Sequence, residues 1–379
     1  MRLLYHCACA EGGLAEYARE QAAALAALPG VELFWQAPEA LSAPRGTMFA
    51  TPLEEQTYGG RLKICRLMGF VRSNVGPMRA LVAEARRCQP DAILLSTWHE
   101  YFAPIWAPGL RRLRRQGIRI GAVIHDPVRD YVLGPSWWHR LSVREAYSFL
   151  DAAFTHDASP PDTCGAGLPQ QVVQIPHGPY VVPEGRAGRA EVRRELGIPE
   201  DATVLLSFGH IRDGKSLDQV ISALPRLPGV HLLVAGREQS QGQKPAGFYR
   251  DLAAELGVAE RCHFHTSYIP NEMVWRYFRA SDMLLLTYSG DFRSASGVLN
   301  VNAQFGLPVL ASAGRSPLLD AVAEYRLGTV IVQPDAASIA EAVPRTLGFK
   351  GEWQRFADEN SWRINAERVA EALSEKLPQ

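Results

Sequence analysis

Short apolar runs alternate with helical patterns along the whole chain. In the first half, buried strands are predicted by the runs at 2–9, 31–36, 91–97, 118–126, 152–155 and 172–176. In the second half, the corresponding runs lie at 204–208, 230–235, 262–267, 283–286, 308–312 and 329–332. Strands that alternate with helices favour right-handed crossovers and parallel sheets covered by helices on both faces. The sequence therefore predicts an α/β protein made of doubly wound sheets.

The two series are separated by residues 178–190, which are rich in glycine and proline and lack periodicity. A chain of 379 residues also suits two domains. We therefore predict two tandem Rossmann-like domains, at 1–180 and 191–358, joined by a linker. Because ligands of such sheets bind beyond the carboxyl ends of the strands, two facing sheets are expected to form a central cleft. Residues 38–75 are the least regular part and are expected to form a long loop.

Composition and charge narrow the classes of partner. Lysine plus arginine and aspartate plus glutamate are both 40, so the charge balance gives no sign of nucleic-acid binding. The run 110–117 contains four arginines. Together with Lys63, Arg66 and Arg72 it suggests peripheral contact with a membrane, the alternative being a solvated helix face. Six cysteines without metal-binding spacing, and a start without a signal peptide, indicate a cytoplasmic protein that contacts the inner face of the membrane if it contacts one.

Glycines and cations follow the first strand of each half. Gly12 and Gly13 stand between a strand and a helix, where they could admit a ligand to the amino end of that helix or simply form a tight turn. In the second half, Gly209 is followed by Arg212 and Lys215. Two cations at the carboxyl end of a strand suit a diphosphate, whose negative charge grows as it leaves. The alternative is a solvated basic loop.

Small residues follow the strand predicted at 283–286. Ser294 precedes an expected helix, and Ser296, Gly297 and Val298 open it. Free amides at the start of a helix can hold phosphate oxygens, so these residues are candidates for binding a donor diphosphate. An ordinary serine-capped helix is the alternative.

Two histidines lie at strand ends in the first half. His125 ends an apolar strand, where its imidazole could contact a transferred sugar. His99 holds a similar position after the run ending at Trp98. Either histidine could instead be structural.

These motifs, in this order, resemble glycosyltransferase family 4, the retaining nucleotide-sugar transferases with the GT-B fold. The matches are clearest in the second half: Gly-x-Ile-Arg-x-x-Lys at 209–215, Ala-Gly at 235–236, Ser-Gly-Val-Leu at 296–299 and Phe-Gly-x-Pro-Val at 305–309. Ile175 to Gly178 and Ser361-Trp362 also match. The resemblance covers nearly the whole chain. It implies that the last segment, 359–379, is a helix that crosses back onto the first domain.

The resemblance also implies a chemistry. The protein is expected to be a hexosyltransferase of polysaccharide biosynthesis that uses a UDP-sugar or GDP-sugar donor, retains the anomeric configuration and needs neither a cofactor nor a metal. Arg212 and Lys215 are expected to stabilise the leaving diphosphate, and His125 to orient the sugar. The acceptor, a glycan, a lipid-linked glycan or a small molecule, is expected near Gly12 and His99.

The remaining donor contacts are implied in the same way. Gly13 is expected to contact the donor diphosphate, and Gly209 and Ser294 are expected to border the donor. Its base is expected near Tyr268 and Ile269. Many members of the family carry two glutamates eight positions apart, where this chain has Arg293 and Val301. Asp291 is the expected replacement for the first glutamate, which contacts the donor sugar. The second, which grips the nucleotide ribose, has no replacement at Val301.

Two other functions fit the same fold. A noncatalytic protein that binds a sugar nucleotide or a glycan is suggested by Val301. A sugar-nucleotide epimerase is the other alternative, although its reaction needs acid and base groups for the sugar ring, and the sequence shows no clear set of them.

Overall fold

The computed structural model of the protein describes residues 1–54, 63–98, 100–125, 135–157, 167, 169, 171–238 and 242–375, with the backbone alone for 63–68. These residues form two units. The first consists of Met1–His177 and Ser361–Gln379, and the second of Gly178–Asn360. Among the described helices, none is long and apolar enough to cross a membrane.

The described part of the first unit contains seven parallel strands in the order β3-β2-β1-β4-β5-β6-β7. These are β1 (Arg2–Cys7), β2 (Glu32–Gln36), β3 (Met48–Phe49), β4 (Ala92–Thr97), β5 (Arg119–Ile124), β6 (Ala152–Thr155) and β7 (Gln171–Gln174). The helices are α1 (Gly13–Ala26), α2 (Lys63–Cys88), α3 (Ala103–Arg115), α4 (Ser136–Tyr147) and α13 (Trp362–Ser374), with the one-turn helix η1 (Glu100–Phe102) before α3.

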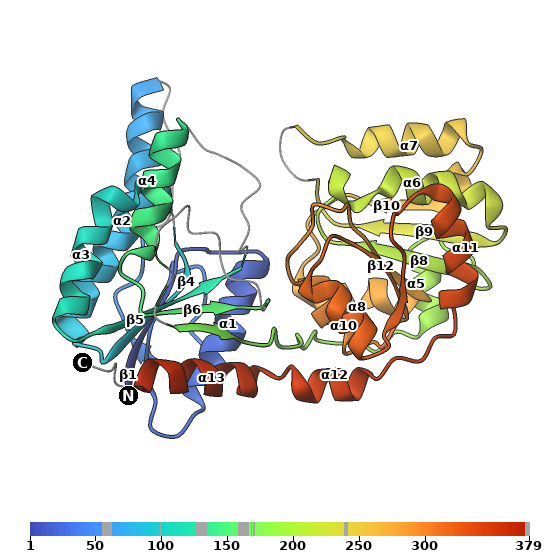
Figure 1. Cartoon of the computed structure of the whole chain (residues 1–379). Helices are drawn as coiled ribbons and strands as arrows, with labels where there is room; N and C mark the ends of the chain where they lie inside the picture. The colour runs from blue at the N-terminus through green and yellow to red at the C-terminus, as the bar shows by residue number, and fades with distance from the viewer. Residues whose placement is uncertain are drawn as a thin grey trace. The chain divides into compact units, whose positions relative to one another are not determined.

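Helices cover both faces of this sheet. Successive residues of a strand point to opposite faces, so each strand contributes side chains to both layers. Ile93 and Leu95 of β4 are buried in the cluster formed with α2, α3 and α4. Leu94 is buried in the other cluster, with α1 and α13 (Figure 1). A Cβ at Gly121 of β5 would lie 3.0 Å from a Leu373 methyl group. A glycine there therefore lets α13 lie close to the sheet.

The described part of the second unit contains six parallel strands in the order β10-β9-β8-β11-β12-β13. These are β8 (Thr203–Phe208), β9 (Val230–Ala235), β10 (Cys262–His265), β11 (Met283–Thr287), β12 (Val309–Ser312) and β13 (Gly328–Val330). The helices are α5 (Arg189–Glu195), α6 (Leu217–Ala223), α7 (Ala246–Glu255), α8 (Asn271–Ala280), α9 (Gly297–Asn302), α10 (Pro317–Glu324), α11 (Ala336–Thr346) and α12 (Trp353–Glu359), with one-turn helices η2 (Asp213–Lys215), η3 (Leu224–Arg226) and η4 (Ala259–Arg261).

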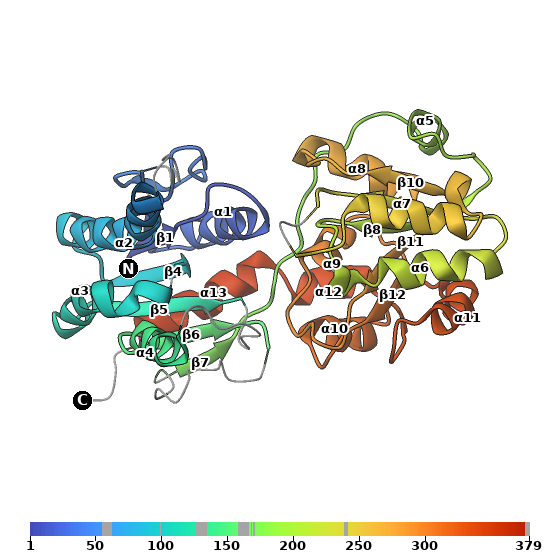
Figure 2. The ribbon, with the colours of Figure 1, turned by 90° about the horizontal axis from the view of Figure 1, so that it is seen from above.

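The second sheet is also covered on both faces. Leu205 and Leu285 pack in the cluster with α6, α7 and α11, and Leu206 and Leu286 pack in the cluster with α8, α10 and α12. In Figure 2, α6 and α7 lie in front of this sheet. The predicted class, two doubly wound parallel sheets, is therefore confirmed. The last helix, α13, packs on α1 in the first unit, as expected.

The expected loop at 38–75 was wrong in its second part. Helix α2 begins at Lys63 and continues through Pro77. Gly76 and Pro77, near the middle of α2, made a helix here hard to predict. Proline is unfavourable inside a helix because it removes one backbone hydrogen bond. The helix forms because Val75, Met78 and Leu81 are buried against the sheet, and packing outweighs intrinsic propensity.

Candidate active site

The strand order of each sheet reverses at one point, between β1 and β4 in the first and between β8 and β11 in the second. Loops leaving neighbouring strands diverge at such a point, which creates a crevice at the carboxyl ends of the strands. Gly12 and Gly13 follow β1, the segment 209–216 follows β8, and Ser294 to Val298 follow β11. The motifs predicted from sequence therefore lie at the ligand-binding edges of the two sheets.

The loop after β8 is held tightly to the end of the sheet. Gly209 has φ +86°, a conformation that favours glycine. The ammonium of Lys215 donates to the carbonyl of Phe208, and the side chain is 8% exposed. The hydroxyl of Thr287, at the end of β11, donates to the carbonyl of Lys215 over 3.0 Å. These contacts place Lys215 beneath the turn at Gly209.

The side chains of this loop form a cluster of cations that no nearby acidic side chain of the described residues neutralises. Burial, together with the neighbouring Arg212, lowers the pKa of Lys215 to about 7. Arg237, two residues after β9, donates from Nε to His210 Nε2 over 3.4 Å. Burial and these three cations lower the pKa of His210. Among the described residues, no carboxylate lies within ion-pair distance of Arg212, Lys215 or Arg237. The cluster is therefore suited to a polyanionic ligand.

The loop after β11 supplies a stacked aromatic pair beside the cations. The rings of Tyr288 and Phe292 have centroids 4.0 Å apart. The guanidinium of Arg212 lies 5.7 Å from the first ring and 5.8 Å from the second. Ser296 is the N-cap of α9, and its Oγ accepts from the Leu299 amide at 3.4 Å. The two aromatic rings therefore orient Arg212 without any carboxylate.

The other residues predicted for the donor differ in exposure. Gly297 begins α9, and a Cβ added at this position would lie 3.8 Å from the ring of Tyr180. Tyr268 is 57% exposed after β10, whereas Ile269 packs against the core of the second unit. Asp291 is exposed in a turn. Val301 packs against the same core, so this position serves packing in the present chain.

In the first unit, His125 belongs to an aromatic cluster centred on Tyr17. The Tyr17 ring contacts His125, His156, His177 and Trp362, at centroid distances of 4.7, 5.3, 5.1 and 5.0 Å. The three histidines follow β5, β6 and β7, and Trp362 begins α13. The cluster therefore lies at the carboxyl edge of the first sheet.

The imidazoles of His125 and His156 are both neutral. Burial lowers the pKa of His125 to about 3 and that of His156 to about 4. His156 Nδ1 lies 3.1 Å from the carbonyl of Ile175, so this nitrogen carries the proton. A hydrogen bond to the backbone of Ser96 partly offsets the effect of burial on the pKa of His125. The Nε2 atoms of both rings are buried without a hydrogen-bond partner. Each thus presents a lone pair that suits a hydroxyl donor.

Three further candidates complete the sequence predictions. Gly12 precedes α1 with φ +87°, and both Gly12 and Gly13 are exposed, with no atom within 4 Å of a Cβ at either position. The amino end of α1 is therefore open. His99 lies outside the described residues. Within those residues, no group of three or more His, Cys, Asp or Glu side chains is placed to hold a metal ion.

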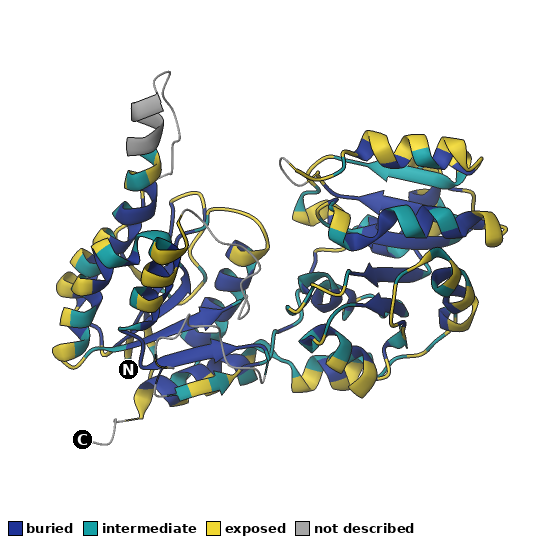
Figure 3. Ribbon diagram, turned by 45° about the horizontal axis from the view of Figure 1, so that its top comes forward, coloured by how far each residue is buried: buried dark blue, intermediate teal, exposed yellow. Residues whose placement is uncertain are grey.

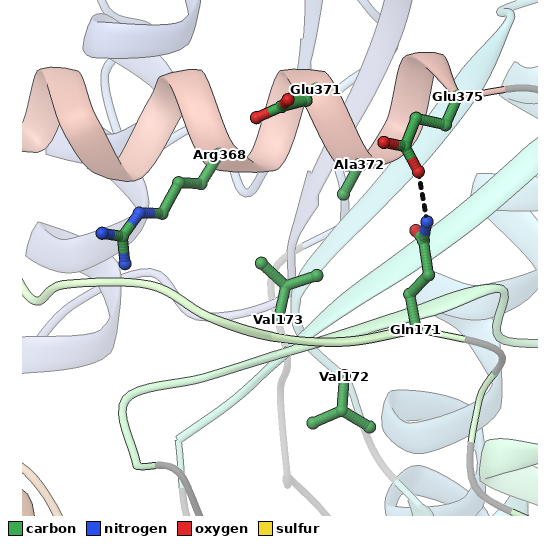
Figure 4. A pocket seen from close by; sticks show the side chains of 7 residues that line it. All are labelled: Gln171, Val172, Val173, Arg368, Glu371, Ala372 and Glu375. Carbon is green, nitrogen blue, oxygen red and sulfur yellow. Dashed lines mark hydrogen bonds between the residues drawn. The ribbon is translucent and has the colours of Figure 1, made fainter.

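A shallow hollow lies elsewhere on the first unit, between β7 and α13 (Figure 4). Gln171 and Glu375 close one end of it through a hydrogen bond of 2.6 Å. It contains none of the predicted site residues. We therefore do not assign it to the reaction.

Sequence reasoning missed several residues at these edges. Arg237 directly follows the Ala-Gly pair at the end of β9, so its position beside the strand could have indicated it. Tyr17, His156, His177 and Trp362 come together only through the fold, because they belong to four separate segments of the chain.

The family described as "Glycosyl transferases group 1" matches residues 188–361, which make up most of the second unit. D-inositol 3-phosphate glycosyltransferase of Mycobacteroides abscessus is 31% identical over 189 residues, 49% of this chain and 41% of the relative. The enzyme of the same name from Mycobacterium bovis is 34% identical over 163 residues, 42% of this chain and 32% of the relative. The matched part thus spans less than half the length of these relatives.

Solved structures resemble the whole chain. HepE of Anabaena in complex with UDP has a TM-score of 0.70 at 15% identity, covering 99% of this chain and 100% of that one. Sucrose-phosphate synthase of Thermosynechococcus elongatus has a TM-score of 0.64 at 17% identity, covering 98% and 94%. Likeness at such low identity shows the fold alone. The fold of the chain is therefore GT-B, and residues 188–361 are similar to the group 1 glycosyl transferases.

Proposed function

We propose that this protein is a retaining glycosyltransferase that moves a hexosyl group from a nucleoside diphosphate sugar to a hydroxyl of a glycan, a lipid-linked glycan or a small molecule. The observation that carries the proposal is the buried ammonium of Lys215 beside Arg212, with no carboxylate of the described residues in ion-pair distance of either cation. Burial of an unpaired cation is unfavourable, and an anionic ligand removes the penalty. A diphosphate supplies the required charge.

In this proposal the cations act mainly on the leaving group. Arg212 and Lys215 hold the diphosphate, and the first amides of α9, at Gly297 and Val298, donate to its oxygens. As the bond from sugar to phosphate breaks, negative charge grows on the phosphate oxygen, so these contacts strengthen in the transition state. The leaving phosphate accepts the proton of the acceptor hydroxyl. Neutralisation by two side chains makes a metal unnecessary.

The first unit contributes neutral groups in the same proposal. His125, kept neutral by burial, orients the sugar without serving as a base. The open amino end of α1, at Gly12 and Gly13, leaves room for the acceptor. UDP-sugars are the first donors to test, since the structures of Anabaena HepE contain UDP and UDP-glucose.

Two measurements test this function. A thermal-shift screen with UDP-sugars and GDP-sugars should find a donor that raises the melting temperature, since a ligand of the native state stabilises it by mass action. The same donor, incubated without acceptor, should slowly release free sugar with retained anomeric configuration, read by NMR. Binding without any release would favour a noncatalytic protein, and an isomeric nucleotide sugar would favour an epimerase.

A further inference from the structure

The three helices on one side of the first sheet hold a large excess of positive charge. Within α2, α3 and α4 the sequence has twelve arginines and lysines but only two glutamates, Glu84 and Glu145. The whole chain, by contrast, has a formal net charge of zero. The excess on these helices is therefore balanced by acidic groups elsewhere in the molecule.

The carboxylates of these helices are withdrawn from the surface, whereas most arginines are not. Glu84 is buried and pairs with Arg87, and Glu145 is partly buried and pairs with Arg111. Exposed arginines without a carboxylate in ion-pair distance, among the described residues, form the set we call the basic face: Arg79, Arg86, Arg112, Arg115, Arg140 and Arg144.

This surface differs from the one that the run 110–117 suggested. Leu110 and Leu113 are buried in the core, and Arg114 pairs with the buried Asp151. Only Arg112 and Arg115 of that run remain for an external partner. Lys63 and Arg66 lie where side chains are outside the described residues. The basic face instead draws on all three helices.

Large apolar side chains are exposed beside the arginines, at the amino ends of the same helices. Trp137 is 62% exposed and Leu141, one turn later on α4, is 38% exposed. Ile105 in the first turn of α3 is 46% exposed, and Phe70 of α2 is 41% exposed. We call these four residues the apolar rim. Exposed residues are yellow in Figure 3.

The apolar rim is one connected region. Phe70 packs edge-on against Phe102 of η1, with ring centroids 5.8 Å apart. The hydroxyl of Ser142, on α4, donates to the carbonyl of Tyr101, also in η1, over 2.7 Å. Helix η1 leads directly into α3, which holds Ile105. Because α3 and α4 follow β4 and β5, the rim lies toward the carboxyl edge of the sheet.

We propose that the basic face and the apolar rim together bind the surface of a bilayer that contains anionic lipid. Tryptophan favours the boundary between headgroups and acyl chains, and arginines are attracted to anionic headgroups. A nucleic acid would use the arginines but gives no role to four exposed apolar side chains. The proposal rests on surface contacts and not on the proposed transferase activity.

Vesicle sedimentation tests the proposal. Phosphatidylcholine vesicles are compared with vesicles of phosphatidylcholine and phosphatidylglycerol at equal total lipid. The protein should pellet with the anionic vesicles at low salt and return to the supernatant as salt rises. Failure to pellet with either kind overturns the proposal, whatever the enzyme assay shows.

Matched variants identify the surface. One variant replaces four arginines of the basic face with glutamine, and a control replaces four exposed arginines elsewhere: Arg112, Arg115, Arg140 and Arg144 against Arg45, Arg194, Arg226 and Arg345. The first should weaken vesicle binding by about tenfold or more, and the control by less than about twofold. Equal loss in both variants overturns the assignment, and unchanged thermal unfolding confirms that each variant is folded.

The rim is tested separately by Trp137→Ser. This variant should weaken binding to anionic vesicles while leaving the dependence on salt unchanged, because it removes apolar contact and no charge. If Trp137→Ser binds vesicles as the native protein does, and double-stranded DNA binds with similar affinity, the face is a general polyanion site and the membrane proposal is wrong.

Discussion

The ring of Tyr17 meets the imidazole of His125 edge-on, with centroids 4.7 Å apart and planes at 89°. The same ring also contacts His177, the last residue before the chain enters the second unit, and Trp362, the second residue after it returns. The Tyr17 hydroxyl accepts hydrogen bonds from Gln21 and Asn365, at 3.3 and 3.1 Å. Tyr17, itself held by these hydrogen bonds, therefore fixes the position of the His125 ring.

Tyr17→Leu is expected to lower kcat by about tenfold or more, since a small displacement of an orienting group is costly. Tyr17→Phe keeps the ring, so it should keep most of the turnover while losing about 1–3 kcal/mol of stability with the hydrogen bonds. Phe149→Leu is the control, because Phe149 is equally buried but packs on Trp106 in the cluster on the other face of the sheet. If Phe149→Leu lowers kcat as much as Tyr17→Leu, general destabilisation explains both.

Loss of either cation should affect the chemical step. Lys215→Met, which preserves the buried volume, and Arg212→Ala are each expected to lower kcat by about 100-fold, because a charge-assisted contact to the leaving group is removed. Lys350→Ala and Arg226→Ala, at exposed positions of the same unit, should retain native rates. Near-native rates at saturating donor in the first pair would refute the diphosphate assignment.

The pKa of Lys215 gives a dependence of donor binding on pH. In the free protein this pKa is about 7, so the ammonium is lost as pH rises above that value. A bound diphosphate favours the charged form and raises the pKa, so binding should take up a proton. We expect kcat/KM to fall above about pH 7, by up to about tenfold per pH unit, and calorimetry in two buffers to record the uptake. Lys215→Met should show neither effect.

Buried neutral histidines should make the protein sensitive to acid. His125 and His156 have folded pKa values of about 3 and 4, below the value of about 6.5 for an unfolded chain. As pH falls from about 6.5 toward 4, the unfolded state gains protons that the folded state does not, so stability decreases. Each histidine contributes about 1.4 kcal/mol per pH unit in that window. Denaturant unfolding should show a shallower pH slope for His156→Gln, and an unchanged slope would contradict the burial argument.

Activity is expected to persist in excess chelator, because Arg212 and Lys215 neutralise the diphosphate in our proposal. The assay compares initial rates with and without chelator, and then with added magnesium. Complete loss of activity that magnesium restores would show that the side chains do not suffice.

The sequence predicted those parts of the site that are local in the chain. Gly209, Arg212 and Lys215 lie within one turn after a strand, so identifying the strand also located the cations. Strand positions were predictable for the same reason, because buried apolar runs are local. Helix α2 was partly missed, since the packing of Met78 and Leu81 that stabilises it is not visible in the neighbourhood of Pro77.

Contacts between distant segments were not predictable. The environment of His125 depends on Tyr17, His156 and Trp362. These residues come together only through the strand order and the packing of α1 on α13. The charge of the basic face was visible in the sequence, but its orientation was not. Leu110 and Arg111 are neighbours in the chain, yet one is buried in the core and the other pairs with Glu145.

The packing of α13 has a consequence for folding during synthesis. Residues of the second unit are continuous in the chain and can fold as soon as they leave the ribosome. The first unit, although begun earlier, lacks Ala366, Val369 and Leu373 until α13 has been made after the second unit, and these residues cover one face of its sheet. That apolar face therefore stays partly uncovered while the rest of the chain is made. The first unit should therefore complete its folding after the second.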